Sequence, residues 1–307
     1  MSTPLLIFVK AVNGGLFVAL FAVVGEILQP KRFAGIFGAS PAVALANLLI
    51  IALVKGDASA RSAATGMIAG TIGLAVACAA AIPAVRRWGA RRGSALLWSV
   101  WILVSGGTAV PIVAGTATAA GAGLPVGHRA RRRRKAGPQD GGGHEDEKLF
   151  AVDFGAVREI RPGELAVRFA FGFAVSVVAG LIGVAAGQRA GGVMLAAPAV
   201  LPATLTIIER QEGRKPAVTE VQGAVPGAVA LIGFAVVAAV ATARLPLAAA
   251  LFAALATWVS AAIAGYFVLA AAVSSWKHEV RQLAFQRRDA AFTRRAQSRL
   301  KAIQSSR

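Results

Sequence analysis

The sequence predicts an all-α membrane protein: a polytopic transmembrane helix bundle of about eight spans, arranged as two parallel four-helix repeats. Hydrophobic residues make up 56% of the 307 residues and charged residues only 15%, whereas about a quarter of a soluble domain is charged. The apolar residues also fall in blocks of about twenty, the length that a helix needs to cross a bilayer. Finally, one segment of the chain recurs 157 positions later.

The recurring segment is residues 32–51, which returns as residues 189–208 with ten identical positions. The same offset continues without a gap and pairs Arg87 with Arg244 and Trp101 with Trp258. Alanines coincide often by chance in so Ala-rich a chain, but arginines, prolines and tryptophans do not. We therefore expect one membrane unit to be present twice.

Each predicted span is a helix, because a backbone inside a bilayer must satisfy its own hydrogen bonds. An even number of spans in each unit predicts the same topology for both units, and hence a pseudo-twofold axis along the membrane normal. The eight apolar blocks are residues 4–28, 33–54, 63–85, 94–119, 166–187, 191–208, 217–242 and 247–273.

Four segments follow from this pattern. Residues 1–119 form the first membrane unit and residues 165–273 the second. Residues 120–164 form a charged linker whose composition predicts that it is largely disordered. Residues 274–307 form a basic tail, predicted either as an amphipathic helix on an anionic membrane surface or as a solvated, partly helical tail.

The net charge of +19 is concentrated in two clusters, with nine Lys or Arg residues between 129 and 161 and nine between 277 and 307. Such clusters beside a membrane attract anionic lipid and are ordinarily cytoplasmic. We therefore expect anionic lipid rather than nucleic acid as a partner. Both termini and the linker are predicted on the cytoplasmic side of a cell (inner) membrane, and the sequence leaves a homo-oligomer open.

The sequence predicts no enzyme, no cofactor and no metal site. The three histidines, His128, His144 and His278, lie far apart in polar segments, without the spacing of metal ligands. Cys78 is the single cysteine, so an intramolecular disulfide is excluded. No pairing of a nucleophile with a base and no carboxylate dyad emerges.

Two arginines, Arg32 and Arg189, stand just before the spans that carry the repeated segment. Related by a twofold axis, they could bind an anion bidentately. Alternatively, each anchors the end of a helix at the lipid phosphates. The sequence favours the anchor without excluding the anion site.

Pro41 and Pro198 lie about nine residues into these spans. Each removes a backbone hydrogen bond to the residue four positions earlier and predicts a kink. Broken helices present freed backbone groups to the substrate in transporters, although prolines are also common as packing kinks. Ser40, Asn47 and Thr204 could line a polar path beside them.

Glu26 is an ionisable residue near the end of the first span. Such a group inside a membrane is a candidate for proton relay or cation binding. The alternative is an interfacial carboxylate paired with Lys31 or Arg32.

Two small-residue motifs of the form GxxxG occupy equivalent places in the third and seventh spans. Small residues four apart let membrane helices approach closely. We expect helix packing, either within each unit or across the pseudo-twofold axis, at Gly66, Gly70, Gly223 and Gly227.

A charge after the first span, followed by the pattern AGxxxxxPxxAL, resembles the GlpM-type small inner-membrane proteins and their relatives classed as a domain of unknown function. Residues 31–45 match this pattern, residues 188–202 match it more loosely, and the Arg86-Arg87-Trp88-Gly89 hinge is similar. The second copy departs from it, with Pro202 in place of Leu45 and Gly183 in place of Glu26. The resemblance implies an integral membrane protein of about four spans per unit.

Two hypotheses follow. The first is a transporter or flippase for a small or amphiphilic envelope metabolite, anionic if the paired arginines bind it. The second is a non-transporting membrane scaffold that recruits partners or anionic lipid through its basic linker and tail.

Overall fold

A computed structural model describes residues 2–29, 31–113, 151–152, 162–269 and 271. The predicted tail lies outside these residues, and so does the predicted linker apart from residues 151–152 and 162–164. The helices are α1 (Thr3–Ile27), α2 (Lys31–Gly38), α3 (Ala42–Lys55), α4 (Asp57–Trp88), α5 (Ala90–Val113), α7 (Pro162–Ala185), α8 (Gly187–Met194), α9 (Leu201–Gln211), α10 (Arg214–Ala241) and a last helix, Leu247–Leu269. The strand β1 (Leu28–Gln29) pairs antiparallel with β2 (Ala151–Val152).

Six of the described helices are long and apolar enough to cross a membrane: α1, α4, α5, α7, α10 and the last helix. The fold is thus helical, compatible with a multi-pass membrane protein. The two remaining predicted spans, 33–54 and 191–208, are not continuous helices. Each is divided into two short helices, α2 with α3 and α8 with α9.

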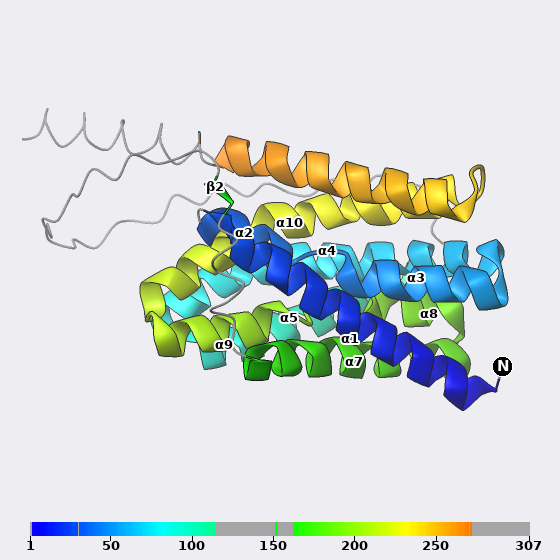
Figure 1. Cartoon of the computed structure of the whole chain (residues 1–307), viewed down its shortest axis with the longest axis horizontal. Coiled ribbons are helices and arrows are strands. Elements are labelled where there is room, and N and C mark those ends of the chain that lie inside the picture. The colour runs from blue at the N-terminus through cyan, green and yellow to red at the C-terminus, as the bar shows by residue number, and fades with distance from the viewer. Residues whose placement is uncertain (1, 30, 114–150, 153–161, 270, 272–307) are drawn as a thin grey trace, which may run out of the picture.

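The helices α4 and α10 form the centre of the bundle (Figure 1). About half of each is buried, including Met67 and Leu74 of α4 and Leu231 and Phe234 of α10. The outer helices turn large apolar side chains outward, as at Leu103 of α5. Exposed side chains of this kind suit lipid rather than water.

The helices α1 and α7, which the 157-residue offset relates, run antiparallel. Val18 of α1 lies against Gly172 of α7, and Ile7, earlier in α1, lies against Gly180, later in α7. The contacts therefore occur in reverse order along the two helices. The prediction of parallel repeats is therefore wrong, because parallel units would place equivalent helices in the same direction.

The antiparallel arrangement places the loops at two opposite ends (Figure 1). One end, called here the basic end, holds residues 26–29, 88–90, 151–152 and 209–214, joined by contacts such as that of Glu209 with Ala90. The start of α1, the 55–57 turn and the carboxyl end of α5 lie at the other end, called the N-terminal end. Residue 113, before the linker, and residue 151, within it, are thus at opposite ends.

The two ends of the described chain lie apart. The predicted common side for both termini and the linker stays a prediction, because residues 114–150 and 272–307 lie outside the described residues. The last helix packs antiparallel to α10, with Gly265 against Pro226 and Thr257 against Gly233. It therefore runs back to the basic end, whereas α1 begins at the N-terminal end (Figure 1).

Pro41 and Pro198 break their helices rather than kink them. The helix α2 ends at Gly38 and α3 begins at Ala42, while residues 195–200 separate α8 from α9. The carbonyls of Phe37 and Met194, which the missing proline N–H groups were expected to free, accept hydrogen bonds from Ser40 N and Ala197 N at 3.2 and 3.0 Å. Tight turns thus satisfy the carbonyls that the prediction had left free.

The GxxxG glycines pack the central helices against the short helices of the other unit. A Cβ atom at Gly66 or Gly70 of α4 would meet the backbone of α8, at Arg189 and Val193 respectively. A Cβ atom at Gly227 of α10 would meet the backbone of α2, at Ile36. The close approach therefore joins the two units, and its partner is the broken helix rather than the opposite GxxxG motif.

The matched tryptophans make matched hydrogen bonds. Trp101 Nε1 donates to the carbonyl of Gly70 at 3.0 Å, and Trp258 Nε1 donates to the carbonyl of Gly227 at 3.1 Å. Both side chains are almost fully buried. They therefore fix α5 on α4 and the last helix on α10, and do not form an interfacial aromatic belt.

We expect replacement of Glu209 by alanine to lower the free energy of unfolding by about 1 kcal/mol. Glu209 Oε2 accepts a hydrogen bond from the N–H of Ala90, the first residue of α5, at 2.6 Å. Its other oxygen meets the exposed Arg214 side chain at 3.3 Å. Thermal unfolding in detergent measures the effect, and R214A is the control because it removes only the exposed ion pair. Equal losses in both variants would contradict a capping role.

Candidate functional site

The two helix breaks meet at the middle of the bundle, around a cavity of about 10 Å³ that we call the crossing. All but Val18 of its lining residues fall into pairs 157 positions apart, such as Ala39 with Ala196 and Leu74 with Leu231. Ser40 contributes the polar side chain of the wall, and its hydroxyl oxygen is buried with no hydrogen-bond partner. The volume is about that of one water molecule.

A larger cavity of about 110 Å³, called here the vestibule, lies between the crossing and the basic end. It shares Gly38 and Val200 with the crossing, so the two cavities adjoin. Among the described residues, four carboxylates and one guanidinium line it. The lining residues are Ala22, Gly25, Glu26, Phe37, Gly38, Glu164, Arg168, Val200, Thr204, Ile207, Ile208, Gln211, Glu212 and Glu220.

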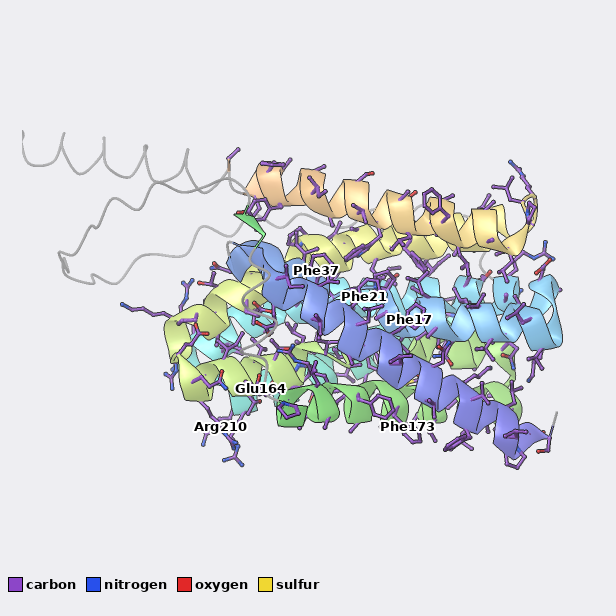
Figure 2. All side chains as sticks on the ribbon, viewed as in Figure 1. Phe17, Phe21, Phe37, Glu164, Phe173 and Arg210 are labelled. Carbon is purple, nitrogen blue, oxygen red and sulfur yellow. The ribbon has the colours of Figure 1, made fainter. Side chains whose placement is uncertain are left out.

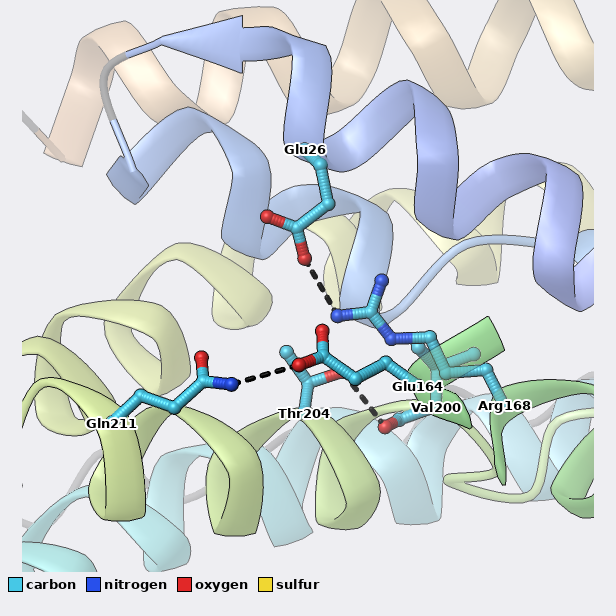
Figure 3. Close-up of polar contacts among 6 residues, drawn as sticks. All are labelled: Glu26, Glu164, Arg168, Val200, Thr204 and Gln211. Atoms are coloured by element: carbon cyan, nitrogen blue, oxygen red, sulfur yellow. Dashed lines mark hydrogen bonds and ion pairs between the residues drawn. The ribbon is translucent and has the colours of Figure 1, made fainter. Parts of the chain in front are cut away.

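An ion pair links the two units at the wall of the vestibule (Figure 3). Arg168 Nη2 of α7 donates to Glu26 Oε1 of α1 at 2.6 Å. The Arg168 side chain is 3% exposed and the Glu26 side chain 43% exposed. Burial of an unpaired guanidinium is costly, so Glu26 provides the charge that allows Arg168 to stay inside the bundle.

Two further hydrogen bonds order the vestibule (Figure 3). Gln211 Nε2 of α9 donates to Glu164 Oε1 of α7 at 2.7 Å, near the mouth. Deeper, Thr204 Oγ1 donates to the carbonyl of Val200 at 3.1 Å. The polar groups therefore extend from the basic end to the break in the second broken helix.

The wall also includes aromatic carbon. Phe37 of α2 packs against Phe21 of α1 and Trp258 of the last helix, with ring centroids 6.3 and 5.7 Å away. Figure 2 shows Phe37 beside Phe21, with Glu164 and Arg210 toward the basic end. Glu164 and Arg210 both line a wider neighbouring groove of about 580 Å³.

The vestibule belongs to one end of the molecule only. At the positions 157 residues away, Glu26, Arg168 and Glu220 are replaced by Gly183, Ala11 and Ala63 respectively. The N-terminal end therefore lacks charges at these positions, and the two ends of the bundle differ chemically.

The structure brings some of the predicted path residues together. Glu26 and Thr204 line the vestibule, and Ser40 lines the crossing. Asn47 lies beyond the crossing, where its Nδ2 donates to Ser176 Oγ of α7 at 2.9 Å. Pro41 lies at the break itself.

The predicted arginine pair is not brought together. Arg32 starts α2 at the basic end, and Arg189 starts α8 at the N-terminal end. An anion bound between both side chains is therefore excluded, because equivalent positions of antiparallel units lie at opposite ends. The Arg189 Nε atom is buried with no hydrogen-bond partner.

Glu26 pairs with Arg168, 142 residues away, which the sequence analysis did not predict. The side chains of the predicted partners, Lys31 and Arg32, lie outside the described residues. Sequence reasoning missed Arg168 and the buried Glu220, although both fall inside predicted spans. A buried Lys10 in the first span was missed too. The signal was available: a charged residue inside an apolar block is a functional candidate wherever it occurs.

Comparison with known proteins gives one family match. Residues 7–110, from α1 into α5, match the family described as Protein of unknown function (DUF3147). No curated protein and no solved structure shows significant similarity to the chain. This part of the sequence is thus similar to an uncharacterised family, and that similarity carries no activity.

Proposed function

We propose that the protein is a transporter for a small polar solute, which enters through the vestibule and passes the crossing between two inverted units. One observation carries this proposal. The vestibule, which is charged and open toward the basic end, adjoins the crossing, where the two broken helices meet. Irregular backbone is tolerated at membrane depth where it lines a cavity, and broken helices at an interface between repeats are typical of solute sites in transporters.

The proposal includes the architecture. A duplicated GlpM-like unit, with each broken helix counted as one crossing, gives two sets of four crossings among the described residues, and the two sets run in opposite directions. The matched tryptophan bonds, the matched turns before Pro41 and Pro198, and the paired lining of the crossing support this duplication.

A cationic solute suits the vestibule better than the anionic cargo expected from sequence. Of the described lining residues, Glu26, Glu164, Glu212 and Glu220 carry carboxylates, and Arg168, which pairs with Glu26, carries a guanidinium. A concave surface of one charge sign raises the local concentration of solutes of opposite charge. We thus propose that the solute passes through the vestibule without being chemically changed. That the protein is not an enzyme stays a prediction.

The proposal places the basic end in the cytoplasm. Short loops near membrane helices carry more Lys and Arg on the cytoplasmic side. Of the residues described at helix ends, nine such residues lie at the basic end and four at the N-terminal end. The nine are Lys31, Arg32, Arg86, Arg87, Arg91, Arg92, Arg210, Arg214 and Lys215, and the four are Lys55, Arg61, Arg189 and Arg244.

Thiol labelling tests solvent access and charge preference together. The Cys78→Ala background removes the buried native cysteine, and I207C places a thiol in the vestibule. We expect reaction in vesicles from the basic-end side, faster with a cationic trimethylammonium-ethyl thiosulfonate than with an anionic sulfonato-ethyl thiosulfonate. The preference should weaken in E164Q.

Ala77→Cys, at a fully buried position of α4, is the matched control and should not react. An inert I207C would show that the vestibule is closed to water, and faster anionic labelling would overturn the cationic solute. Either result removes support for the transporter.

A further inference from the structure

Beyond the crossing, polar side chains continue toward the N-terminal end although the surrounding bundle is apolar. Asn47 of α3 is 1% exposed, Ser176 of α7 is fully buried and Lys10 of α1 is 4% exposed. Asn13 of α1 donates from Nδ2 to the carbonyl of Ala46 at 3.1 Å. Buried polar groups are costly inside a membrane protein and mark functional paths more often than packing.

Asn47 occupies the place that Thr204 occupies on the vestibule side. The two are 157 residues apart, and each donates to the carbonyl four residues earlier, at Val43 and Val200 respectively. Both valines line the crossing. Because α3 and α9 leave the crossing in opposite directions, Asn47 stands on its N-terminal side at the same depth as Thr204 on its vestibule side.

We propose that these residues mark a second route, closed in this structure, from the crossing to the N-terminal end between α1, α3 and α7. The inference rests on the proposed transport function and names its exit. The hydrogen bond from Asn47 to Ser176 joins α3 to α7 and closes the route at this point. On the other side of the crossing, Thr204 lines the open vestibule.

Lys10 fixes the charge of this route. It lies one helical turn from Asn13 toward the N-terminal end, on the same face of α1. Lys55, the last residue of α3, is a second cation and repels the Lys10 ammonium group. Positive charge here opposes the negative charge of the vestibule, so it restrains cations from leaking through while the route is closed.

The test uses the full chain with Cys78→Ala, in vesicles of both orientations, and the side that labels I207C defines the vestibule side. We expect S176C to react only from the opposite side. There the anionic thiosulfonate should be favoured over the cationic one. K10M should raise the rate of the cationic reagent and lower that of the anionic reagent, by about fivefold each, the effect of one unit charge a few ångströms away in water.

A second position, N13C, covers the case in which S176C does not fold, and A77C is the unreactive control. If I207C reacts while S176C and N13C are inert from both sides, the second route is wrong and the vestibule stands. The second route is equally wrong if S176C reacts from the vestibule side. If I207C is itself inert, the transporter proposal fails first, so the two failures are distinguishable.

Discussion

Replacing Gly66 by alanine is expected to lower the free energy of unfolding by about 2 kcal/mol, within the usual cost of overpacking a filled interior. The added methyl group would overlap the carbonyl oxygen of Arg189 on α8, which is backbone and cannot rotate away. Either α4 or α8 must shift, and both carry the contact between the two units. Thermal unfolding in detergent measures the loss.

The matched control for this variant is G107A. Gly107 is also a helical glycine, on α5, but a Cβ atom there meets nothing within 4 Å. Because alanine costs less backbone entropy than glycine, the control should be neutral or more stable by up to about 1 kcal/mol. G227A, whose methyl group would meet the carbonyl of Ile36 on α2, should behave like G66A. Similar stability of G66A and G107A would contradict the close packing of α4 and α8.

Replacing Glu26 by glutamine is expected to lower the free energy of unfolding by about 1 to 3 kcal/mol. Loss of one partner leaves the buried Arg168 guanidinium without its counter-charge, which costs more than an exposed pair contributes. The figure stays below that for a fully buried pair because Glu26 is 43% exposed and water screens it. The measurement compares the free energy of unfolding of E26Q, of R168M and of the double variant that carries both substitutions.

The double variant should recover most of the stability lost in E26Q, since no unpaired charge then remains in the bundle. R214Q, which breaks only the exposed ion pair with Glu209, should leave stability nearly unchanged. Additive losses in the cycle would mean that Glu26 and Arg168 do not interact.

Composition and periodicity determined the local structure of this protein. Apolar blocks of about twenty residues can only be satisfied as helices in a bilayer, and six of the eight predicted blocks are single long helices in the described chain, while the other two are each divided into two short helices. The 157-residue offset likewise selected Gly66, Gly70, Gly223 and Gly227, all of which lie at close helix contacts. Both features follow from side-chain size and from hydrogen bonding within the local backbone, so the sequence alone is sufficient to predict them.

Tertiary structure alone decided the direction of the units and the partners of the charges. Antiparallel α1 and α7 bring Arg168 to Glu26 across 142 residues and separate Arg32 from Arg189. The same arrangement brings the break at Pro41 to the break at Pro198 and forms the crossing. A hydropathy pattern is unchanged when a helix is turned end over end, so the prediction of parallel units rested on the span count alone and was wrong.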